Sequence, residues 1–499
     1  MPGDRLDTQV IVVGAGPVGL LLAGELRLGG AHVVVLERRA APTTESRAST
    51  LHARTMEILD SRGLLDGIPV PPNDPRGHFA GIPLDLTLPS SFPGQWKVPQ
   101  SDTERLLGRW AAGLGAEIRR GHEVRAVTDT GEHVEAEASG DDGPVLVRGT
   151  HLVACDGEDS TVRDLIGADF PGHGARRELL RADVEGIEVP DRRFERRPDG
   201  LAIAARRADG VTRIMVHEHG ARPPHRTGAL TFGEISRAWK RVTGEDIGGG
   251  TPLWANAFGD AARQLAHYRH GRVLFAGDAA HRQLPIGGQA LNLGLQDAFN
   301  LGWKLAAEVT GRAHLELLDS YHTERHAIGR RVLSAIEAQA MLLLGGPEVE
   351  PLRALITELI GHEDVRAHLA ATISGLDIRY DVGGPSHPLV GARLPQTPLA
   401  ASASGGATST EVLRSGRGLL LGPGPDPGPD PGPDPGRVLG PAPDGRGIPF
   451  ATPVPSHPGT DGAGWTLVRP DGHVVWADPS DTPPHEGPAE ALTRWFGRA

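Results

Sequence analysis

The sequence contains almost no cysteine. Cys155 is the only thiol among its 499 residues. A single cysteine excludes an intrachain disulfide, a zinc site built from several cysteines and a C-x-x-C redox pair. A chain so poor in thiols fits a reducing compartment, and we expect a cytoplasmic protein.

A surplus of positive charge and long apolar runs are also missing. The net charge is -12, whereas binding to a phosphate backbone needs a basic surface. The longest uncharged run near the start, residues 9–24, is too short to span a bilayer and is broken by glycine and proline. Asp4 and Asp7 precede this run, which makes it unlike a signal peptide. We therefore expect neither a nucleic acid nor a membrane as a partner.

Hydrophobic patterning predicts an α/β organisation in the first part of the chain. At roughly 150 residues per domain, the length predicts two to four domains. Residues 9–13 and 32–37 are apolar, β-branched runs typical of buried parallel strands, and residues 20–28 between them have helical periodicity. Residues 50–62 are predicted as a helix, and residues 291–345 as strongly helical.

The middle and the end of the chain have different patterns. From about residue 170 to residue 270, patchy alternation indicates an antiparallel sheet. Residues 422–436 form a DPGP repeat, in which proline blocks both helix and central strand, so an exposed loop is expected. Residues 464–478 predict a β-hairpin around Pro470, Asp471 and Gly472. The tail is therefore predicted to be a small separate domain.

The first motif that carries chemistry is GAGPVG. Gly14 allows a tight turn, Gly16 lets the backbone approach a pyrophosphate, and Gly19 lets helix and strand pack closely. The N-terminus of the following helix would face the phosphates. Glu37, at the end of the next strand, is placed to accept a hydrogen bond from a ribose hydroxyl. The motif predicts a dinucleotide without separating FAD from NAD; for Arg38, a solvated strand end is favoured over a 2′-phosphate contact.

Two further motifs end a strand in a turn. LVACDGEDSTVR ends its strand in Asp156-Gly157, a common transition from strand to helix. RVLFAGDAAHRQLPIGGQ ends its strand in Gly277-Asp278 and continues through Pro285, Gly287 and Gly288 into a long helix. The chain thus has a second glycine-rich turn far from the first.

One long cofactor would explain both glycine-rich turns. If the first turn holds the pyrophosphate of FAD, the second can hold the ribityl chain and the isoalloxazine ring. Asp278 can accept hydrogen bonds from ribityl hydroxyls, while Gly287 and Gly288 let backbone lie against a flat ring. The next helix would aim its positive end at the N1–C2=O edge of the ring. Two such turns suit one flavin better than two separate nucleotides.

The three motifs, in this order, resemble those of the class A flavoprotein monooxygenases, the aromatic hydroxylases, over about residues 1–390. The tail, with LVRPDGHVVW, is similar to the C-terminal thioredoxin-like domain of aromatic polyketide hydroxylases. The resemblance implies an α/β fold: a Rossmann-like FAD-binding domain with an inserted antiparallel-sheet substrate domain and a C-terminal thioredoxin-like domain. The implied boundaries are 1–170 with 271–390 for the FAD-binding domain, 171–270 for the substrate-binding middle domain, and 391–499 for the thioredoxin-like domain, which lacks C-x-x-C and carries the 422–436 loop.

The resemblance also implies an activity. NAD(P)H, a transient co-substrate, would reduce FAD; O₂ would then give a flavin C4a-hydroperoxide that hydroxylates a polycyclic aromatic polyketide in antibiotic biosynthesis. Baeyer–Villiger oxygen insertion or epoxidation remains open, because both use the same cofactor site. A flavin-dependent halogenase, whose W-x-W-x-I-P segment we do not find, and a non-catalytic flavoprotein are the competing hypotheses from different classes. The sequence leaves a homodimer open.

The family's site residues can be carried over by motif. FAD would be bound by Gly14, Gly16, Gly19, Glu37, Arg38, Arg47, Gln100, Asp156, Asp278, Pro285, Gly287, Gly288, Leu291 and Asn292. No catalytic side chain is certain; Arg47, His281 and Pro285 are expected near flavin or substrate. Leu284 and Ala290 stand where the family usually has Pro and Gly, which weakens the carry-over in that loop.

Several other residues have a structural interpretation beside the functional one. A structural role is favoured for His281 over contact with flavin or substrate. No metal is expected, because His217 and His219 lack a supporting ligand pattern. Trp254 and Phe258, with Trp239, would either line the substrate cavity or pack in the core.

Overall fold

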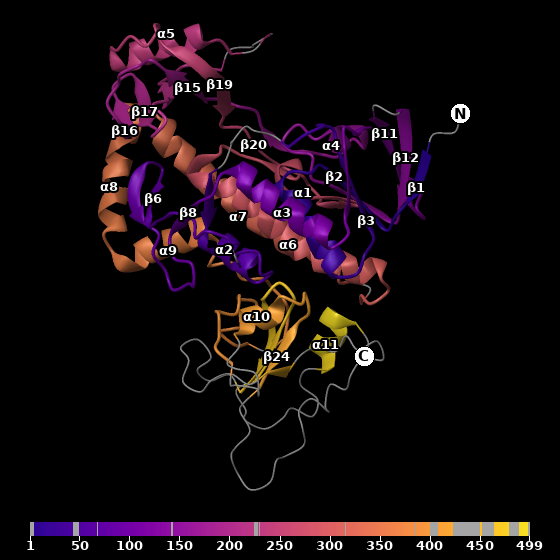
Figure 1. Cartoon of the computed structure of the whole chain (residues 1–499). Helices are drawn as coiled ribbons and strands as arrows, with labels where there is room; N and C mark the ends of the chain where they lie inside the picture. Colours follow the sequence, from indigo (N-terminus) through magenta and orange to yellow (C-terminus); the bar gives the residue numbers. More distant parts are fainter. Residues whose placement is uncertain are drawn as a thin grey trace.

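The computed structural model of the chain describes residues 4–42, 49–66, 68–140, 143–223, 228, 230–314, 316–384, 386–399, 408–422, 450–451, 464–478 and 489–497. Figure 1 shows a large body that contains the long helices and most of the sheets, with the C-terminal segment packed below it.

A six-stranded sheet forms the centre of the body, in the order β21-β22-β13-β2-β3-β9. Its strands are β2 (Val10–Val13), β3 (Val33–Glu37), β9 (Glu117–Arg120), β13 (His151–Ala154), β21 (Arg269–His270) and β22 (Val273–Phe275). Neighbours from β22 to β9 are parallel, and β21 is antiparallel at the edge. Every residue of β2 and β13 is buried, as expected for a sheet covered on both faces. The predicted strands at 9–13 and 32–37 are confirmed as β2 and β3.

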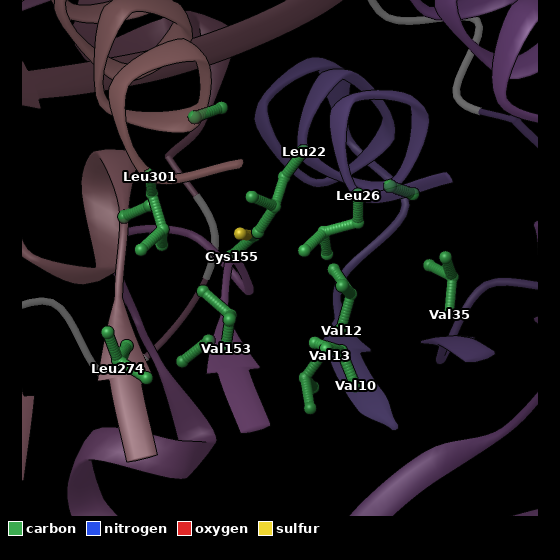
Figure 2. Packing of buried hydrophobic residues seen from close by; sticks show 14 of the residues in the cluster. Val10, Val12, Val13, Leu22, Leu26, Val35, Val153, Cys155, Leu274 and Leu301 are labelled. Carbon is green, nitrogen blue, oxygen red and sulfur yellow. The ribbon is translucent and has the colours of Figure 1, made fainter. Parts of the chain in front are cut away.

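Helices on one face of this sheet form the main core. α1 (Pro17–Leu28) joins β2 to β3 and packs against α3 (Gln100–Gly113) and α6 (Gln289–Val309). Figure 2 shows Leu22 and Leu26 of α1 and Leu301 of α6 packed over the strands, whose labelled side chains are Val10, Val12, Val13, Val35, Val153 and Leu274. Burying one such side chain is worth roughly 1.5–3 kcal/mol. The β-α-β pattern of the sequence is therefore the nucleus of the largest hydrophobic cluster.

Smaller sheets surround the central one. β1 (Asp4–Asp7), β12 (Gly143–Gly149), β11 (Val134–Gly140) and β10 (Glu123–Asp129) form a four-stranded sheet in that order. Three short sheets are built from β4 (Thr50–His52), β8 (Gln95–Lys97) and β5 (Asn73–Asp74); from β6 (Arg76–Phe79) and β7 (Ile82–Asp85); and from β14 (Gly172–His173), β20 (Ala262–Gln264) and β23 (His281–Arg282).

A five-stranded antiparallel sheet lies at one end of the body (Figure 1), in the order β16-β17-β18-β15-β19. Its strands are β15 (Glu178–Glu185), β16 (Arg192–Arg197), β17 (Gly200–Arg206), β18 (Thr212–Glu218) and β19 (Thr251–Gly259), and α5 (Phe232–Thr243) covers one face. The antiparallel sheet predicted between about 170 and 270 is thus confirmed. The boundaries of the three predicted domains stay predictions.

The remaining helices are α2 (Ala53–Asp60), α4 (Thr161–Leu165), α7 (Asp319–Leu344), α8 (Glu350–Ile360) and α9 (Glu363–Ser374), with short 3-10 helices η1 (Gly277–Ala279), η2 (Ile286–Gly288) and η3 (Pro347–Val349). The helical region predicted at 291–345 is two helices, α6 and α7. Among the described residues no single helix is long and apolar enough to cross a bilayer; one pair, Asp319–Leu344 with Pro347–Ile360, bent by 116°, meets the criteria together by length and composition.

The helix predicted at 50–62 is wrong at its start. Residues Thr50–His52 form strand β4, which pairs with β8, and the helix begins only at Ala53. The pairing partner lies more than forty residues away, so a local helical pattern could not reveal it.

The C-terminal segment contains a four-stranded sheet in the order β25-β24-β26-β27. Its elements are α10 (Ser409–Leu413), β24 (Leu419–Leu421), β25 (Phe450–Ala451), β26 (Trp465–Val468), β27 (Val474–Asp478) and α11 (Ala489–Phe496). The predicted hairpin at 464–478 is confirmed as the antiparallel pair β26–β27. The thioredoxin-like assignment stays a prediction, and the repeat beyond Gly422 lies outside the described residues.

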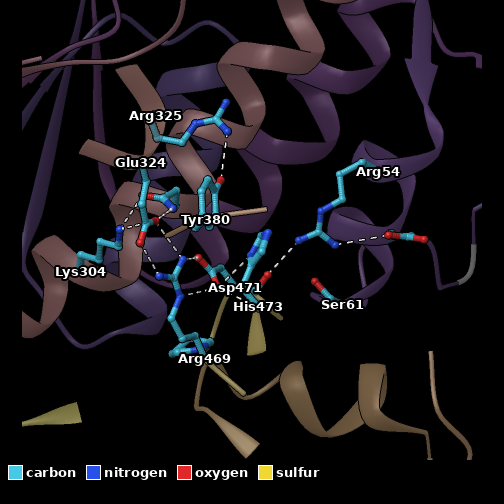
Figure 3. A network of polar contacts seen from close by, with 12 residues as sticks. Arg54, Ser61, Lys304, Glu324, Arg325, Tyr380, Arg469, Asp471 and His473 are labelled. Atoms are coloured by element: carbon cyan, nitrogen blue, oxygen red, sulfur yellow. Dashed lines mark hydrogen bonds and ion pairs between the residues drawn. The ribbon is translucent and has the colours of Figure 1, made fainter. Parts of the chain in front are cut away.

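Buried ion pairs join the hairpin turn to the body (Figure 3). Arg469 donates from both terminal nitrogens to Glu324 of α7, at 2.6 and 3.1 Å, and also pairs with Asp471. Lys304 of α6 donates to the same Glu324 at 2.8 Å and to Asn300 at 2.9 Å. All the charged side chains of this cluster are buried, and unpaired they would be costly, so the C-terminal segment and α6 depend on each other.

The ionisation of Glu324 should contribute to stability. Burial alone would raise the pKa of Glu324, but Arg469 and Lys304 hold it at about 2, below its ordinary value of 4.5. A carboxylate with a depressed pKa in the folded state stabilises it above the unfolded pKa and loses this contribution as the pH falls. We expect the free energy of unfolding to decrease as the pH falls from about 4.5 toward about 2, measured by urea titration at a series of pH values.

Glu324→Gln tests this assignment, because it should flatten that acid dependence and lower stability by about 3–5 kcal/mol. Glu337→Gln is the matched control, since Glu337 is a half-exposed carboxylate on the same helix. Equal acid dependence in wild type and Glu324→Gln would contradict the assignment.

Candidate functional site

The first glycine-rich turn has an open anion-binding geometry. Gly14 has φ of +104°, and a Cβ there would collide with the carbonyl oxygen of Cys155. A Cβ at Gly16 would meet no atom within 4 Å. Gly16 is the N-cap of α1, whose first turn has neither a side-chain cap nor an acidic residue. The first backbone N–H groups of α1 therefore have no anion of their own, which suits a phosphate.

Glu37 is anchored beside this turn. Its carboxylate accepts hydrogen bonds from the backbone N–H of Ala15 at 2.8 Å and of Arg39 at 2.9 Å. Arg38 and Arg39 are exposed at the end of β3. The carboxylate is thus held where the turn and the strand end meet; its contact with a ribose stays a prediction.

The second motif lies next to the first. β13 is parallel to β2, and the backbone N–H of Cys155 donates to the carbonyl oxygen of Val13 at 2.7 Å. Asp156 follows; its Oδ2 accepts from the N–H of Val162 at 3.1 Å, while its buried Oδ1 has no hydrogen-bond partner among the described residues. Burial raises the pKa of Asp156. Such a buried acceptor without a donor is the kind of group that a ligand hydroxyl satisfies.

The third motif is held by a buried carboxylate that the sequence analysis missed. Asp297 of α6 accepts from the N–H of Gly277 at 3.1 Å, from His281 Nε2 at 2.8 Å and from Arg325 Nε at 2.7 Å. Burial opposes the ionisation of Asp297, but Arg325 and His281 outweigh it and lower its pKa. A charged residue inside the apolar helix 289–309 was the available signal, although its partners lie far away in sequence.

His281 is fully buried and bonded to Asp297, while its Nδ1 has no hydrogen-bond partner. This arrangement agrees with the structural role that the sequence favours. Asp278, by contrast, is exposed in η1, just after β22. The two side chains thus differ: His281 fixes the turn inside the core, and Asp278 lies at the surface.

The loop before α6 adopts left-handed backbone at both of its glycines. Gly287 has φ of +62° and Gly288 of +73°; a Cβ on Gly288 would lie 3.3 Å from the Cβ of Thr50. Asn292 donates to the carbonyl oxygens of Thr50 and Gly288 and accepts from the N–H of His52. The start of α6, which has no side-chain cap, is therefore fastened to strand β4.

The other predicted residues lie around this loop or outside the described residues. Pro285 is exposed and Leu291 is half-buried, while Leu284 is buried in an apolar cluster with Ile286. Gln100 is half-buried at the first position of α3. Arg47 lies outside the described residues.

The three turns meet at one edge of the central sheet. β2, β13 and β22 are adjacent and parallel, so Gly14, Asp156 and Gly277 all follow carboxyl ends of strands. Arg163 of α4 also donates to the carbonyl oxygen of Ala279 at 3.3 Å, which ties the second motif to the third. Ligands of open α/β sheets bind at this edge. The arrangement can therefore bind one extended, anionic cofactor.

Comparison with known proteins identifies the family of the chain. A family model for an FAD-binding domain matches residues 7–335, and one for the C-terminal domain of aromatic-ring hydroxylases matches residues 387–499. The chain is 40% identical over 514 residues to the 12-dehydrotetracycline 5-monooxygenase/anhydrotetracycline 6-monooxygenase of Streptomyces rimosus subsp. rimosus, with 98% of this chain and 99% of the relative covered. It is 37% identical over 504 residues to the dialkyldecalin synthase of Streptomyces rugosporus, with 99% and 100% covered.

A solved structure is similar over the whole length. CabE, an aromatic hydroxylase from angucycline biosynthesis, has a TM-score of 0.91 and 47% identity, and 99% of this chain and 100% of that chain are covered. Family models, relatives and fold agree with the motifs at the edge of the sheet. The chain therefore belongs to the family of FAD-dependent aromatic-ring hydroxylases.

Proposed function

We propose that this protein is a monooxygenase that uses FAD, NAD(P)H and O₂ to hydroxylate a polycyclic aromatic polyketide in antibiotic biosynthesis. One observation carries the proposal: three turns that follow parallel strands lie at one edge of the central sheet, and η1 of the third turn contacts α6, whose uncapped start follows the left-handed Gly287–Gly288 backbone. The named hydroxylases and monooxygenases among its relatives support the reaction class.

The residues present fit FAD, and each part of the cofactor has a proposed partner. The open space beside Gly16 and the start of α1 would take the pyrophosphate, and Glu37 the ribose. Asp278 would accept from the ribityl hydroxyls. Gly287 and Gly288 would lie against the ring, and the positive end of α6 would favour negative charge at the ring edge. Pro285 and Leu291 would border this site.

Bound FAD would supply the redox chemistry: with the two electrons of a hydride from NAD(P)H, one oxygen atom of O₂ would enter the substrate and the other would leave as water. The chain itself would orient both partners and exclude water. We propose that NAD(P)H binds transiently, because the sequence has only one complete GxGxxG unit and FAD would occupy it. Neither His281 nor Pro285 needs to act as a nucleophile or a base in this scheme.

A second candidate function is a reaction on a polyketide that needs no redox turnover. The dialkyldecalin synthase relative motivates this candidate, because its name describes a synthase and the two chains match over nearly their whole length. This candidate is distinct from the non-catalytic flavoprotein, because it still converts a substrate. It differs from the first proposal in one measurable way, because no NAD(P)H would be consumed.

The test of the proposed function starts from purified protein. We expect it to be yellow with one FAD per chain, to oxidise NADPH or NADH faster when a phenolic polycycle is added, and to give a product heavier by one oxygen atom. Mass spectrometry and the decrease in NAD(P)H absorbance measure this. A flavin-containing protein that converts a substrate without NAD(P)H consumption would favour the second candidate instead. Baeyer–Villiger insertion adds the same mass, so the product's carbon skeleton decides between it and hydroxylation.

The ribityl assignment predicts that Asp278→Ala weakens FAD binding. Loss of a charged hydrogen-bond acceptor should lower the affinity about tenfold or more. Fluorescence titration of apoprotein with FAD measures the change. Asp164→Ala is the control, because Asp164 is an exposed carboxylate on α4 near the second motif. Unchanged affinity in Asp278→Ala would place the ribityl chain elsewhere.

The ring assignment predicts that Gly288→Val uncouples the reaction. A side chain there would be strained at φ of +73° and would crowd both Thr50 and the flavin. We expect less product and more hydrogen peroxide per NAD(P)H consumed. Gly210→Val is the matched control, since Gly210 has φ of +85° and open space beside it in the turn between β17 and β18.

Gly210→Val should lower stability without lowering the yield of product per NAD(P)H, because it has the same backbone strain but lies outside the proposed flavin site. The ratio of product to NAD(P)H consumed, measured at equal FAD content, separates the two variants. If Gly288→Val keeps the wild-type ratio, the loop is only structural.

A further inference from the structure

The five-stranded antiparallel sheet is covered differently on its two faces. α5 covers one face, which contains Val216 and the fully buried Trp239, so Trp239 is a core residue. The opposite face meets the body, because Leu201 belongs to the same hydrophobic cluster as Leu284 and Ile286. The last two residues lie in the loop 284–288, which we assign to the flavin ring and call the flavin loop. The sheet and this loop therefore share one apolar core.

The C-terminal end of α7 needs hydrogen-bond donors from other elements. The helix is 26 residues long, and its last turn contains no basic residue. The last carbonyl oxygens of a helix have no partner within the helix, and they form the negative end of its dipole. Cationic donors from neighbouring elements therefore suit this end.

Arg196 of the edge strand β16 supplies most of these donors. Its terminal nitrogens donate to the carbonyl oxygens of Leu343, Gly345 and Gly346, at 2.6, 2.8 and 3.1 Å. Its Nε pairs with Glu350 of α8 at 2.7 Å, and only 9% of the Arg196 side chain is exposed. The planar guanidinium thus uses all three of its nitrogens, which the single nitrogen of a lysine could not do.

Two further side chains complete this cap. Nε2 of His217 on β18 lies 2.9 Å from the carbonyl oxygen of Leu344, and Arg353 of α8 donates to that of Leu342 at 2.9 Å. Two of the three side chains at the end of α7 therefore come from the five-stranded sheet. The cap joins the sheet to the body.

Phe194, two residues before Arg196, has a strained backbone. Its φ is +54°, in a region that bulky side chains rarely adopt; among the described residues that are not glycine, only Ala80 shares a positive φ. The register of β16 against β17 shifts between Arg192 and Glu195, which marks a β-bulge. Such strain persists only where surrounding contacts impose it, and it is common at functional sites.

The bulge brings the Phe194 ring against His78 of β6, with ring centres 4.3 Å apart. His78 in turn borders the flavin loop, because a Cβ on Gly287 would lie 4.0 Å from its Cε1. Its Nδ1 accepts from the N–H of Gly81 at 3.2 Å, which fixes the orientation of the ring. Burial and the charge of Arg193 lower the pKa of His78 to about 4, so this ring is neutral at neutral pH.

β16 is thus connected to the flavin loop by two routes. Arg193, between the bulge and Arg196, donates to the carbonyl oxygen of Arg76 at 2.9 Å and fastens β16 to β6. β6 and α7 each contact η2, which lies within the flavin loop. Figure 1 shows β16, β6 and α8 on the same side of the body. One route runs through β6, and the other through the end of α7.

We propose that Phe194 and Arg196 are positioning residues, through which β16 fixes the flavin loop relative to the five-stranded sheet. This inference rests on the proposed function, because it assigns the flavin to the loop and the substrate to the domain that contains the sheet. A misplacement of about 1 Å between reacting groups can cost about 10²-fold in rate. The proposal goes further by assigning this alignment to two side chains of an edge strand.

Five variants separate positioning from simple stability. Arg196→Met removes the donors but keeps an apolar stem, and Arg196→Lys keeps one cationic nitrogen. Phe194→Gly removes the ring together with the backbone strain, whereas Phe194→Tyr keeps both. Arg192→Met is the matched control, because Arg192 is a buried arginine of the same strand that pairs with Glu195 and Glu245.

The first experiment is hydrogen–deuterium exchange of the FAD-loaded protein, followed by mass spectrometry. Arg196→Met and Phe194→Gly should each raise the exchange rate of amides in the flavin loop by about tenfold or more, since each loses one of the two connections. Arg196→Lys should give a smaller increase. Phe194→Tyr and Arg192→Met should exchange at the wild-type rate in this loop. A role confined to local structure would raise exchange only in β16 and the last turn of α7.

The second experiment measures the ratio of product to NAD(P)H consumed, at equal FAD content. Arg196→Met and Phe194→Gly should lower this ratio and release more hydrogen peroxide. Arg192→Met should lower the free energy of unfolding and leave the ratio unchanged. Wild-type exchange in the flavin loop of Arg196→Met and Phe194→Gly overturns the proposal, as does an equal increase in Arg192→Met.

The two proposals fail in different ways. A protein whose loop exchange responds as expected but which oxidises no NAD(P)H contradicts only the monooxygenase. A protein that hydroxylates a substrate, and whose flavin loop exchanges at the wild-type rate in both variants, contradicts only the positioning role.

Discussion

The rest of the structure depends on the hydrogen bonds and ion pairs that the buried carboxylate of Asp297 makes. It joins the turn at Gly277, the imidazole of His281 and the guanidinium of Arg325, all inside the core. A buried charge is tolerated only when it is paired and hydrogen-bonded, so these partners must stay together. Arg325 also donates to the hydroxyl of Tyr380 at 3.0 Å and so extends the network beyond α7. The turn that follows β22 is therefore fixed by α6 and α7.

Two adjacent residues of α7 contact α6 at two positions, seven residues apart. Arg325 reaches Asp297 in the first half of α6, while Glu324 pairs with Lys304 in its second half and with Arg469 of the hairpin (Figure 3). The C-terminal sheet is thus coupled to the same helix whose first residues form the candidate flavin site. This coupling gives a structural role to a C-terminal segment that carries no cysteine pair. It also explains why its hairpin turn is as buried as the body.

Two surfaces of this chain differ in the side chains that they present. One is the edge of the parallel sheet, where glycines leave room for a cofactor. The other is the face of the antiparallel sheet opposite α5, where the rings of Trp254 and Phe258 contact the guanidinium of Arg181. The relatives include hydroxylases and a synthase, so the scaffold alone does not decide the reaction. In our interpretation, the loop through Gly287 and Gly288 contacts the cofactor.

The sequence alone determined the parallel strands, the glycine-rich turns and the β26–β27 hairpin, because each depends on residues that are close together in the chain. The turn from Gly14 to Glu37 needs only one β-α-β unit and was predicted nearly complete. The start of helix α2 was not predicted correctly. The pattern placed it at Thr50, but Thr50–His52 form a strand because a distant strand pairs with them. The pair of Asp297 with Arg325 was also missed. A charged or amide residue has no local signature when its partners lie on other elements. Tertiary packing decided these roles, since only the folded core brings distant charges close enough to compensate for their loss of water.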